Sequence, residues 1–127
     1  ENNLEFQKKL AFLYIDSGRF EESLSCLKKL VDVEPKRFYN WYAYSEVIML
    51  IGEYEDAITV LEQATKIHQR AELYYQLSNS YLHLNDVENG QKALQKALEL
   101  DESLSSDMQE KYPFIKEQIS KEKSKNK

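Results

Sequence analysis

The chain has 127 residues, of which 42% are hydrophobic and 31% are charged, with only three glycines and two prolines. This composition is typical of one soluble, helix-rich domain, and no apolar run reaches the roughly 18 to 20 residues that a membrane-spanning helix needs. The formal net charge is −5, which argues against nucleic acid as the main partner, because phosphate contacts require a basic face.

Apolar residues recur every three or four positions in six successive segments, which is the spacing of amphipathic helices. Gly18 and Gly52 fall at the ends of the first and third segments, where a helix commonly ends in a left-handed residue, and Asn85 takes this place after the fifth. The turns are short, so consecutive helices should be antiparallel neighbours. We predict helices at about residues 4–17, 20–33, 37–51, 54–68, 71–84 and 87–100.

A pattern of small, aromatic and aliphatic residues recurs with a period of 33 to 34 residues, which is the mark of a stacked helical repeat. Its small positions should let paired helices approach closely, while a set of leucines faces the next unit. The three copies contain Leu10-Ala11-x-x-Tyr14, Tyr44-Ser45-x-x-Ile48 and Leu77-Ser78-x-x-Tyr81, followed by Ser23-x-x-x-Leu27, Ala57-x-x-x-Leu61 and Gly90-x-x-x-Leu94.

After Leu100 the period is lost. Residues 102–122 suggest a further helical segment, interrupted or restarted at Pro113, because proline suits a first helical turn. We predict a C-terminal capping helix over the end of the third unit, and a Lys-rich, frayed tail at 123–127. The apolar residues of the predicted capping helix are Leu104, Met108, Tyr112, Phe114, Ile115 and Ile119.

The chain begins Glu1-Asn2-Asn3, which is neither an initiator methionine nor a signal segment, so we expect a piece of a longer protein. The single cysteine, Cys26, excludes an internal disulfide and is interpreted as a packing residue. A chain with one free cysteine and no leader is cytoplasmic by default, although secretion is also compatible with the sequence.

These repeats resemble the tetratricopeptide repeat (TPR) family, whose pattern is W-x₂-L-G-x₂-Y…A-x₃-F…P. The middle unit matches best, with Trp41-x-x-Tyr44-Ser45-x-x-Ile48 and then Ala57-x-x-x-Leu61. The resemblance places three units within residues 1–101, at about 4–35, 37–69 and 71–101. It implies an all-α, right-handed superhelical solenoid of antiparallel helix pairs, whose first helices line a concave groove. Proteins of this family generally bind peptide segments or other proteins as adaptors or scaffolds.

First-helix residues that point neither into their own pair nor into the next unit should line the groove. Aromatic side chains there offer large contact areas at little entropic cost. Packing, or contact with a neighbouring domain, is the alternative role for Phe12, Tyr42 and Tyr75. We select as partner-binding residues Lys8, Phe12, Tyr39, Tyr42, Glu46, Tyr75 and Asn79.

Charge indicates what kind of partner the groove would accept. Glu5, Glu46 and Glu72 make it mildly acidic, which favours a protein or peptide with a Lys or Arg among apolar residues. The carboxylate clamp of the chaperone-binding members of the family is not expected, because only Lys8 matches among its five positions. The sequence therefore predicts a protein-binding groove.

Nothing in the sequence favours catalysis. The only histidines are His68 and His83, no Gly-rich phosphate loop is present, and no metal-ligand spacing occurs. We predict no enzyme activity, catalytic residue, metal or cofactor, and no membrane partner. Two alternatives to groove binding stay open: a scaffold or oligomerisation segment that self-associates through the repeat edge exposed near residue 4, and a docking domain of a larger multidomain protein.

Overall fold

The computed structural model describes residues 4–125, which form eight α-helices and one short 3-10 turn and contain no strand. Each of the first six helices agrees with the sequence prediction to within one residue at either end. The elements are α1 Leu4–Asp16, α2 Phe20–Val33, α3 Phe38–Ile51, α4 Tyr54–Ile67, α5 Ala71–His83, α6 Val87–Leu100, η1 Glu102–Leu104, α7 Ser105–Lys111 and α8 Pro113–Lys125.

The turns within the three helix pairs share one geometry. Gly18, Gly52 and Asn85 have φ values of 73°, 92° and 64°, so the prediction of left-handed residues at these positions is confirmed. In each turn the residue after the left-handed one donates its backbone N–H to a carbonyl five residues earlier. This bond satisfies a carbonyl at the helix end that would otherwise be unpaired. The bonds are Arg19 N to Tyr14 O (2.7 Å), Glu53 N to Ile48 O (3.1 Å) and Asp86 N to Tyr81 O (2.9 Å).

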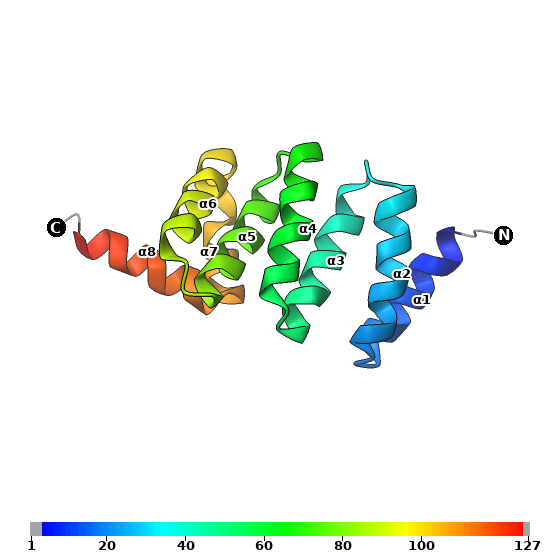
Figure 1. The fold of residues 1–127 in the computed structure, drawn as a ribbon. Coiled ribbons are helices and arrows are strands. Elements are labelled where there is room, and N and C mark those ends of the chain that lie inside the picture. Colours follow the sequence, from blue (N-terminus) through cyan, green and yellow to red (C-terminus); the bar gives the residue numbers. More distant parts are fainter. Residues whose placement is uncertain (1–3, 126–127) are drawn as a thin grey trace.

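The first six helices stack side by side as three antiparallel pairs (Figure 1), and the fold is an all-α, right-handed superhelical solenoid. The predicted small residues Ala11, Ser45, Ser78 and Ala57 are all buried between helices. The leucines that were predicted to face the next unit, Leu27, Leu61 and Leu94, are buried as well. Since no pair can cover its apolar face alone, the stack itself supplies the core.

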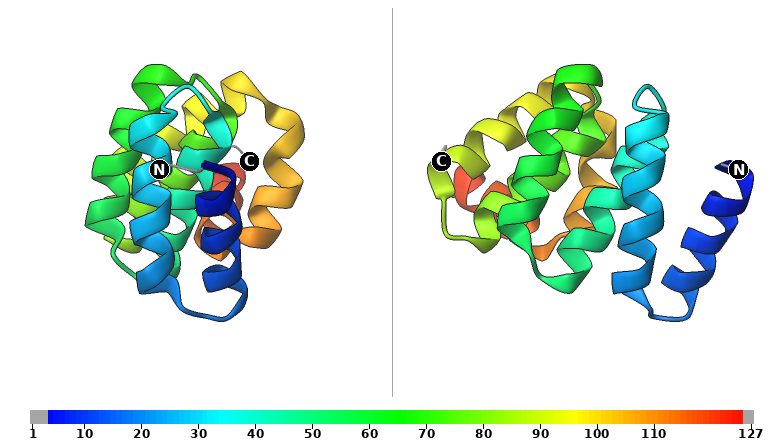
Figure 2. Two further views of the ribbon diagram at one scale, coloured as in Figure 1. Left: turned by 90° about the vertical axis from the view of Figure 1, so that its right-hand side faces the viewer. Right: turned by 45° about the vertical axis from the view of Figure 1, so that its right-hand side comes forward.

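The C-terminal segment restarts at Pro113, as the sequence suggests, and it therefore consists of two helices and not of one continuous capping helix. It forms two helices, α7 and α8, and Pro113 begins the second one. Helix α8 packs against α5, whereas α7 lies on the same side of the stack as α1, away from α2 and α4 (left view of Figure 2). Met108 of α7 and the following Tyr112 bury their apolar surface against the core of the stack, which holds α7 in this place.

Helix α8 continues to Lys125, so residues 123–125 of the predicted frayed tail are helical. The expectations for the first three residues and for residues 126–127 lie outside the described part of the chain. Between residues 4 and 125, none of the helices has both the length and the apolar character required to cross a membrane.

Candidate functional site

The concave side of the stack is formed by the first helices of the three pairs, and it is divided into two parts. Between α1 and α3 the groove is open. Between α3 and α5 it is covered by α7 and by Tyr112, which bond to residues of α3. The seven predicted partner-binding residues are distributed over both parts, so the division decides which of them a partner can reach.

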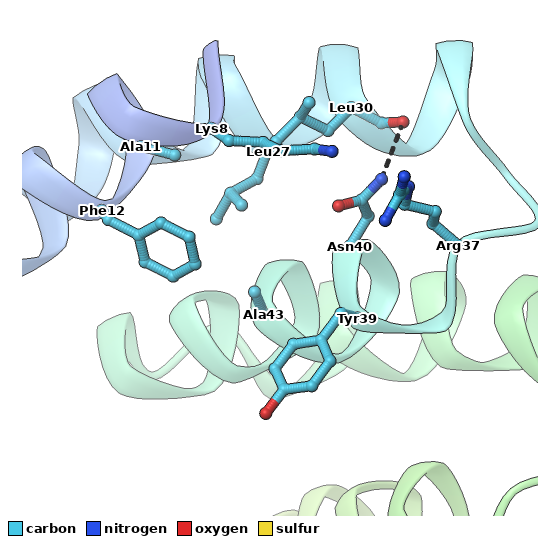
Figure 3. Close-up of a pocket in the computed structure, with 9 residues that line it drawn as sticks. All are labelled: Lys8, Ala11, Phe12, Leu27, Leu30, Arg37, Tyr39, Asn40 and Ala43. Carbon is cyan, nitrogen blue, oxygen red and sulfur yellow. Dashed lines mark hydrogen bonds between the residues drawn. The ribbon is translucent and has the colours of Figure 1, made fainter. Parts of the chain in front are cut away.

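The open part contains a cavity of about 260 Å³. Its walls are the rings of Phe12 and Tyr39, which lie on either side of Ala43 in Figure 3. Phe12 is 54% exposed and Tyr39 is 70% exposed, and both values are high for residues with large apolar side chains. The full set of lining residues is Lys8, Ala11, Phe12, Leu27, Leu30, Arg37, Tyr39, Asn40 and Ala43.

The polar rim of this cavity is internally paired. Lys8 Nζ lies 3.5 Å from Glu34 Oε1 and 3.5 Å from Glu5 Oε2, and Arg37 Nε lies 3.4 Å from Glu34 Oε2. Desolvation disfavours the charged form of Glu34, but the neighbouring Lys8 and Arg37 outweigh it and lower the pKa of this carboxyl. The rim therefore contributes little net charge, and the cavity itself is apolar.

The covered part is organised around Glu46 of α3. Tyr112 donates from its hydroxyl to Glu46 Oε1 over 2.8 Å, and Lys111 Nζ lies 3.2 Å from Glu46 Oε2. Lys111 also donates to the hydroxyl of Tyr42 over 3.2 Å, and its ammonium lies 5.3 Å from the centre of that ring. Tyr42 and Glu46 therefore contact the chain's own C-terminal segment.

Two pKa shifts follow from this packing. Burial raises the pKa of the Tyr112 hydroxyl, and the adjacent negative charge of Glu46 raises it further. For Lys111, desolvation opposes the charged form, but the hydrogen bond to Tyr42 and the Glu46 carboxylate outweigh it and raise its pKa. Lys111 therefore stays positively charged and Tyr112 stays a neutral donor, which is the combination that the Glu46 carboxylate requires.

The sequence prediction is wrong about the accessibility of Tyr75 and Asn79. Tyr75 is 0% exposed and Asn79 is 3% exposed, so a partner cannot touch either of them in this conformation. Helical spacing placed both residues on the correct face of α5. It contained no signal that the C-terminal segment folds back over that face, because the contacts join residues far apart in the chain.

Three residues that bear on the site were missed at the sequence level. Gln76 is fully buried and joins α3 to α5 by donating to Tyr42 O and Glu46 Oε1, each over 3.2 Å, while it accepts from Ser45 Oγ over 2.6 Å. The other two are Lys111 and Tyr112. The sequence did contain a signal for them. Lys111 is a basic residue beside the aromatic Tyr112, and a basic residue among apolar ones is what the sequence predicts for a ligand of the groove.

The predicted acidity of the groove is compensated within the chain. Glu5 is paired with Lys8, Glu46 with Lys111, and Glu72 with Arg70, whose guanidinium lies 3.0 Å from the Glu72 carboxylate. A basic partner would therefore have to replace one of these cations or approach Glu5, whose side chain is 75% exposed.

No cluster of three or more His, Cys, Asp or Glu side chains that could hold a metal occurs in residues 4–125. Both histidines make structural contacts. The His83 ring stacks on Tyr54 with 4.0 Å between ring centres and meets the edge of Phe114 at 4.4 Å. His68 Nε2 lies 3.0 Å from Pro35 O.

Sequence comparison identifies the fold family. A sequence model described as tetratricopeptide repeat matches residues 9–37 and 71–104, which correspond to the first and third units. The chain belongs to the TPR family. Its middle unit, α3 and α4, lies between the two matched segments and has the same helix-pair geometry. A search of curated proteins found no match.

Several solved structures share the architecture of this TPR protein. The Yersinia enterocolitica type III secretion translocator chaperone SycD superposes with a TM-score of 0.79 at 17% identity, covering 97% of this chain and 96% of that one. MamA of MSR-1 gives 0.71 at 20% identity, covering 79% and 58%. A further MamA structure gives 0.74 at 20% identity, covering 91% and 63%.

At these identities the similarity shows a common fold. The chain spans about three fifths of the length of the MamA proteins that it matches. Membership of the TPR family makes this chain a protein–protein interaction module, and modules of this kind are typically not enzymes.

Proposed function

We propose that this TPR protein binds a segment of a partner protein in the open part of its groove, between α1 and α3. The observation that carries the proposal is the apolar cavity with Phe12 and Tyr39 as exposed walls. Large apolar side chains that stay in contact with water around a concavity usually mark an interaction site. An apolar side chain of the partner would enter the cavity, and the two rings would enclose it.

The chemistry of the partner follows from the residues around the cavity. Its anchor is an apolar side chain, because Ala11, Leu27 and Ala43 line the interior. A basic residue next to the anchor would complement the exposed carboxylate of Glu5, as the sequence predicts. The resemblance to SycD, which is a chaperone of translocator proteins, supports a role in holding a segment of another protein.

The test is affinity capture from an extract of the source cells, followed by mass spectrometry. It compares the parent with the double variant Phe12→Ala/Tyr39→Ala, whose melting curve should match the parent because both rings are exposed. The matched control is Val33→Ala, an apolar position on α2 that is 51% exposed and does not line the cavity. We expect one protein to be held by the parent and by the control and lost by the double variant. Identical captures from all three would contradict the proposal.

A second candidate function is self-association through α1. Phe6 and Leu13 are separated by two helical turns, so they lie on one face of α1, and they are 57% and 62% exposed. In a solenoid such a face would stack on another repeat, from a second copy or from a larger protein. Sedimentation of the parent and of Leu13→Glu at tens of micromolar tests this candidate. A monodisperse monomer for the parent would rule out self-association at that concentration.

A further inference from the structure

Helix α7 occupies the covered part of the groove in the way a bound peptide would. It is only seven residues long, from Ser105 to Lys111, and a helix of this length is not stable alone in water. Two side chains anchor the segment, because Met108 and Tyr112 are buried against the core. Lys111 lies beside them with 40% of its side chain accessible.

The polar contacts of this segment concentrate on one receptor side chain. Glu46 accepts from the Tyr112 hydroxyl and pairs with the Lys111 ammonium through its two oxygens. Tyr42 accepts a second bond from Lys111. Tyr42 and Glu46 of α3 thus bind a cation that is followed by an aromatic hydroxyl. The negative charge of Glu46 makes a basic residue the preferred ligand at this place.

The fit of the segment leaves one polar atom unsatisfied. Asn79 Oδ1 is buried and has no hydrogen-bond partner among the described residues. The Asn79 residue borders a cavity of about 180 Å³ that Glu46, His83, Lys111 and Tyr112 also line. Because a buried acceptor without a partner is destabilising, a segment that placed a donor here would bind better than α7 does.

The segment is also separable from the helix that follows it. The backbone leaves helical geometry at Tyr112, where φ is −123° and ψ is 95°, and Pro113 begins α8. Helix α8 has its own anchors on α5, since Ile115 and Gln118 are buried. Helix α7 can therefore leave the groove while α8 stays docked.

We propose that α7 is a resident ligand of the groove between α3 and α5, and that it gives way to a partner segment carrying a basic residue followed by an aromatic one. The part of this inference that concerns the partner rests on the proposed function, while the displacement of α7 does not. As long as α7 is seated, a partner reaches only the open part of the groove. A partner can bind the whole groove only in molecules from which α7 has moved away. Its apparent affinity is therefore the intrinsic affinity multiplied by the fraction of such molecules.

The experiment uses the full chain and a fluorescent synthetic peptide of residues 104–116 as the probe. In the variant Lys111→Glu the resident segment is repelled by Glu46, so the groove is free more often. We expect the probe to bind this variant about tenfold more tightly than the parent. The matched control is Lys121→Glu, the same charge change on α8, where the lysine pairs with Glu117 on the surface. This control should bind the probe like the parent.

Two further measurements make the test decisive. Adding Glu46→Lys to Lys111→Glu restores the internal pair with reversed charges, and it should abolish binding of the lysine-bearing probe. Hydrogen exchange of Lys111→Glu should show lost protection at residues 105–112 and unchanged protection in α5 and in α8 beyond Lys116, because the amides of Ile115 and Lys116 bond to the Tyr112 carbonyl.

Equal probe affinity for the parent and for both single variants would overturn the proposal. Loss of protection throughout α8 and the third unit would also overturn it, because α7 would then be a structural element and not a separable ligand. These outcomes do not depend on Phe12 and Tyr39, so the proposed function and this inference can fail independently.

Discussion

Glu46 is the residue whose surroundings control access to the groove. It is the acidic side chain that faces the covered part, and its two oxygens are engaged by Tyr112, Lys111 and Gln76. A partly buried carboxylate is stable only with such partners, because loss of hydration must be replaced by hydrogen bonds or opposite charge. Any ligand for this part of the groove must therefore supply the cation and the donor that the chain itself now supplies.

At the same scale, His83 should make stability depend on pH. Burial lowers the pKa of its ring, which lies between Tyr54 and Phe114. In the unfolded chain the pKa returns to about 6.5, so the unfolded state binds more protons below that value. Stability should therefore fall as pH decreases through about 6.5 toward the lower pKa of the folded state. Thermal melts between about pH 7.5 and pH 5 measure this slope, and His83→Gln should reduce it. An unchanged slope in that variant would contradict the assignment.

Asn85 offers a second test at the level of one residue. Its φ of 64° is left-handed, a conformation that costs most residues about 1 kcal/mol or more. Asn85→Ala should destabilise the protein by about 1 kcal/mol, whereas Asn85→Gly should be neutral or stabilising. Chemical denaturation of the two variants beside the parent distinguishes them. Equal stability of the alanine and glycine variants would show that backbone conformation is not the controlling factor.

At the scale of elements, α3 and α5 are joined by a buried polar network and not by apolar packing alone. Gln76 on α5 contacts Ser45, Tyr42 and Glu46, all on α3. Because Gln76 is completely buried, its three bonds cannot be replaced by water. The network holds the first helices of the second and third units at a fixed spacing, and that spacing sets the width of the covered groove.

Removing this network should be costly. Gln76→Ala removes three buried hydrogen bonds at once and leaves a space between α3 and α5, which should destabilise the fold by about 1 to 3 kcal/mol. The control is Gln95→Ala on α6, an exposed glutamine whose side chain bonds to Glu99 on the surface of the same helix. Urea denaturation of both variants gives the comparison. Stability losses of similar size in the two would mean that the buried bonds contribute no more than a surface pair.

At the scale of the whole molecule, the stack is anchored unevenly. Helix α5 packs against α3, α4, α6 and α8, and eight of its residues are buried. Helix α1 packs mainly against α2, and only Ala11 is buried in it. In a solenoid the stability of each unit depends on its immediate neighbours, so the edge should open more readily than the centre.

This asymmetry predicts the order of local opening. Native-state hydrogen exchange should show much weaker protection in α1 than in α5, with α3 between them. Since Lys8 and Phe12 of the open groove lie on α1, a bound partner segment should slow exchange there. Uniform protection from α1 to α5 would mean that the described part of the chain opens as one cooperative unit.

The candidate site was predictable in part. Lys8, Phe12 and Tyr39 were selected from helical spacing, and the structure places Lys8, Phe12 and Tyr39 around one open cavity. Tyr42 and Glu46 also lie on the concave side, but they contact Lys111 and Tyr112 of the same chain. Whether any of these residues binds a partner stays a prediction. Tyr75 and Asn79 were assigned to the correct helix face, and their burial could not be foreseen from the periodicity of α5.

The sequence by itself determined the helices, their pairing and the family, because these depend on local features. Apolar spacing, the left-handed positions at Gly18, Gly52 and Asn85, and a repeating set of small residues act within one or two helices. Only the tertiary structure decided where residues 105–112 lie. Lys111 meets Glu46, which lies 65 positions earlier in the chain, and such a contact depends on the shape and charge of a surface that exists only after the repeats have stacked.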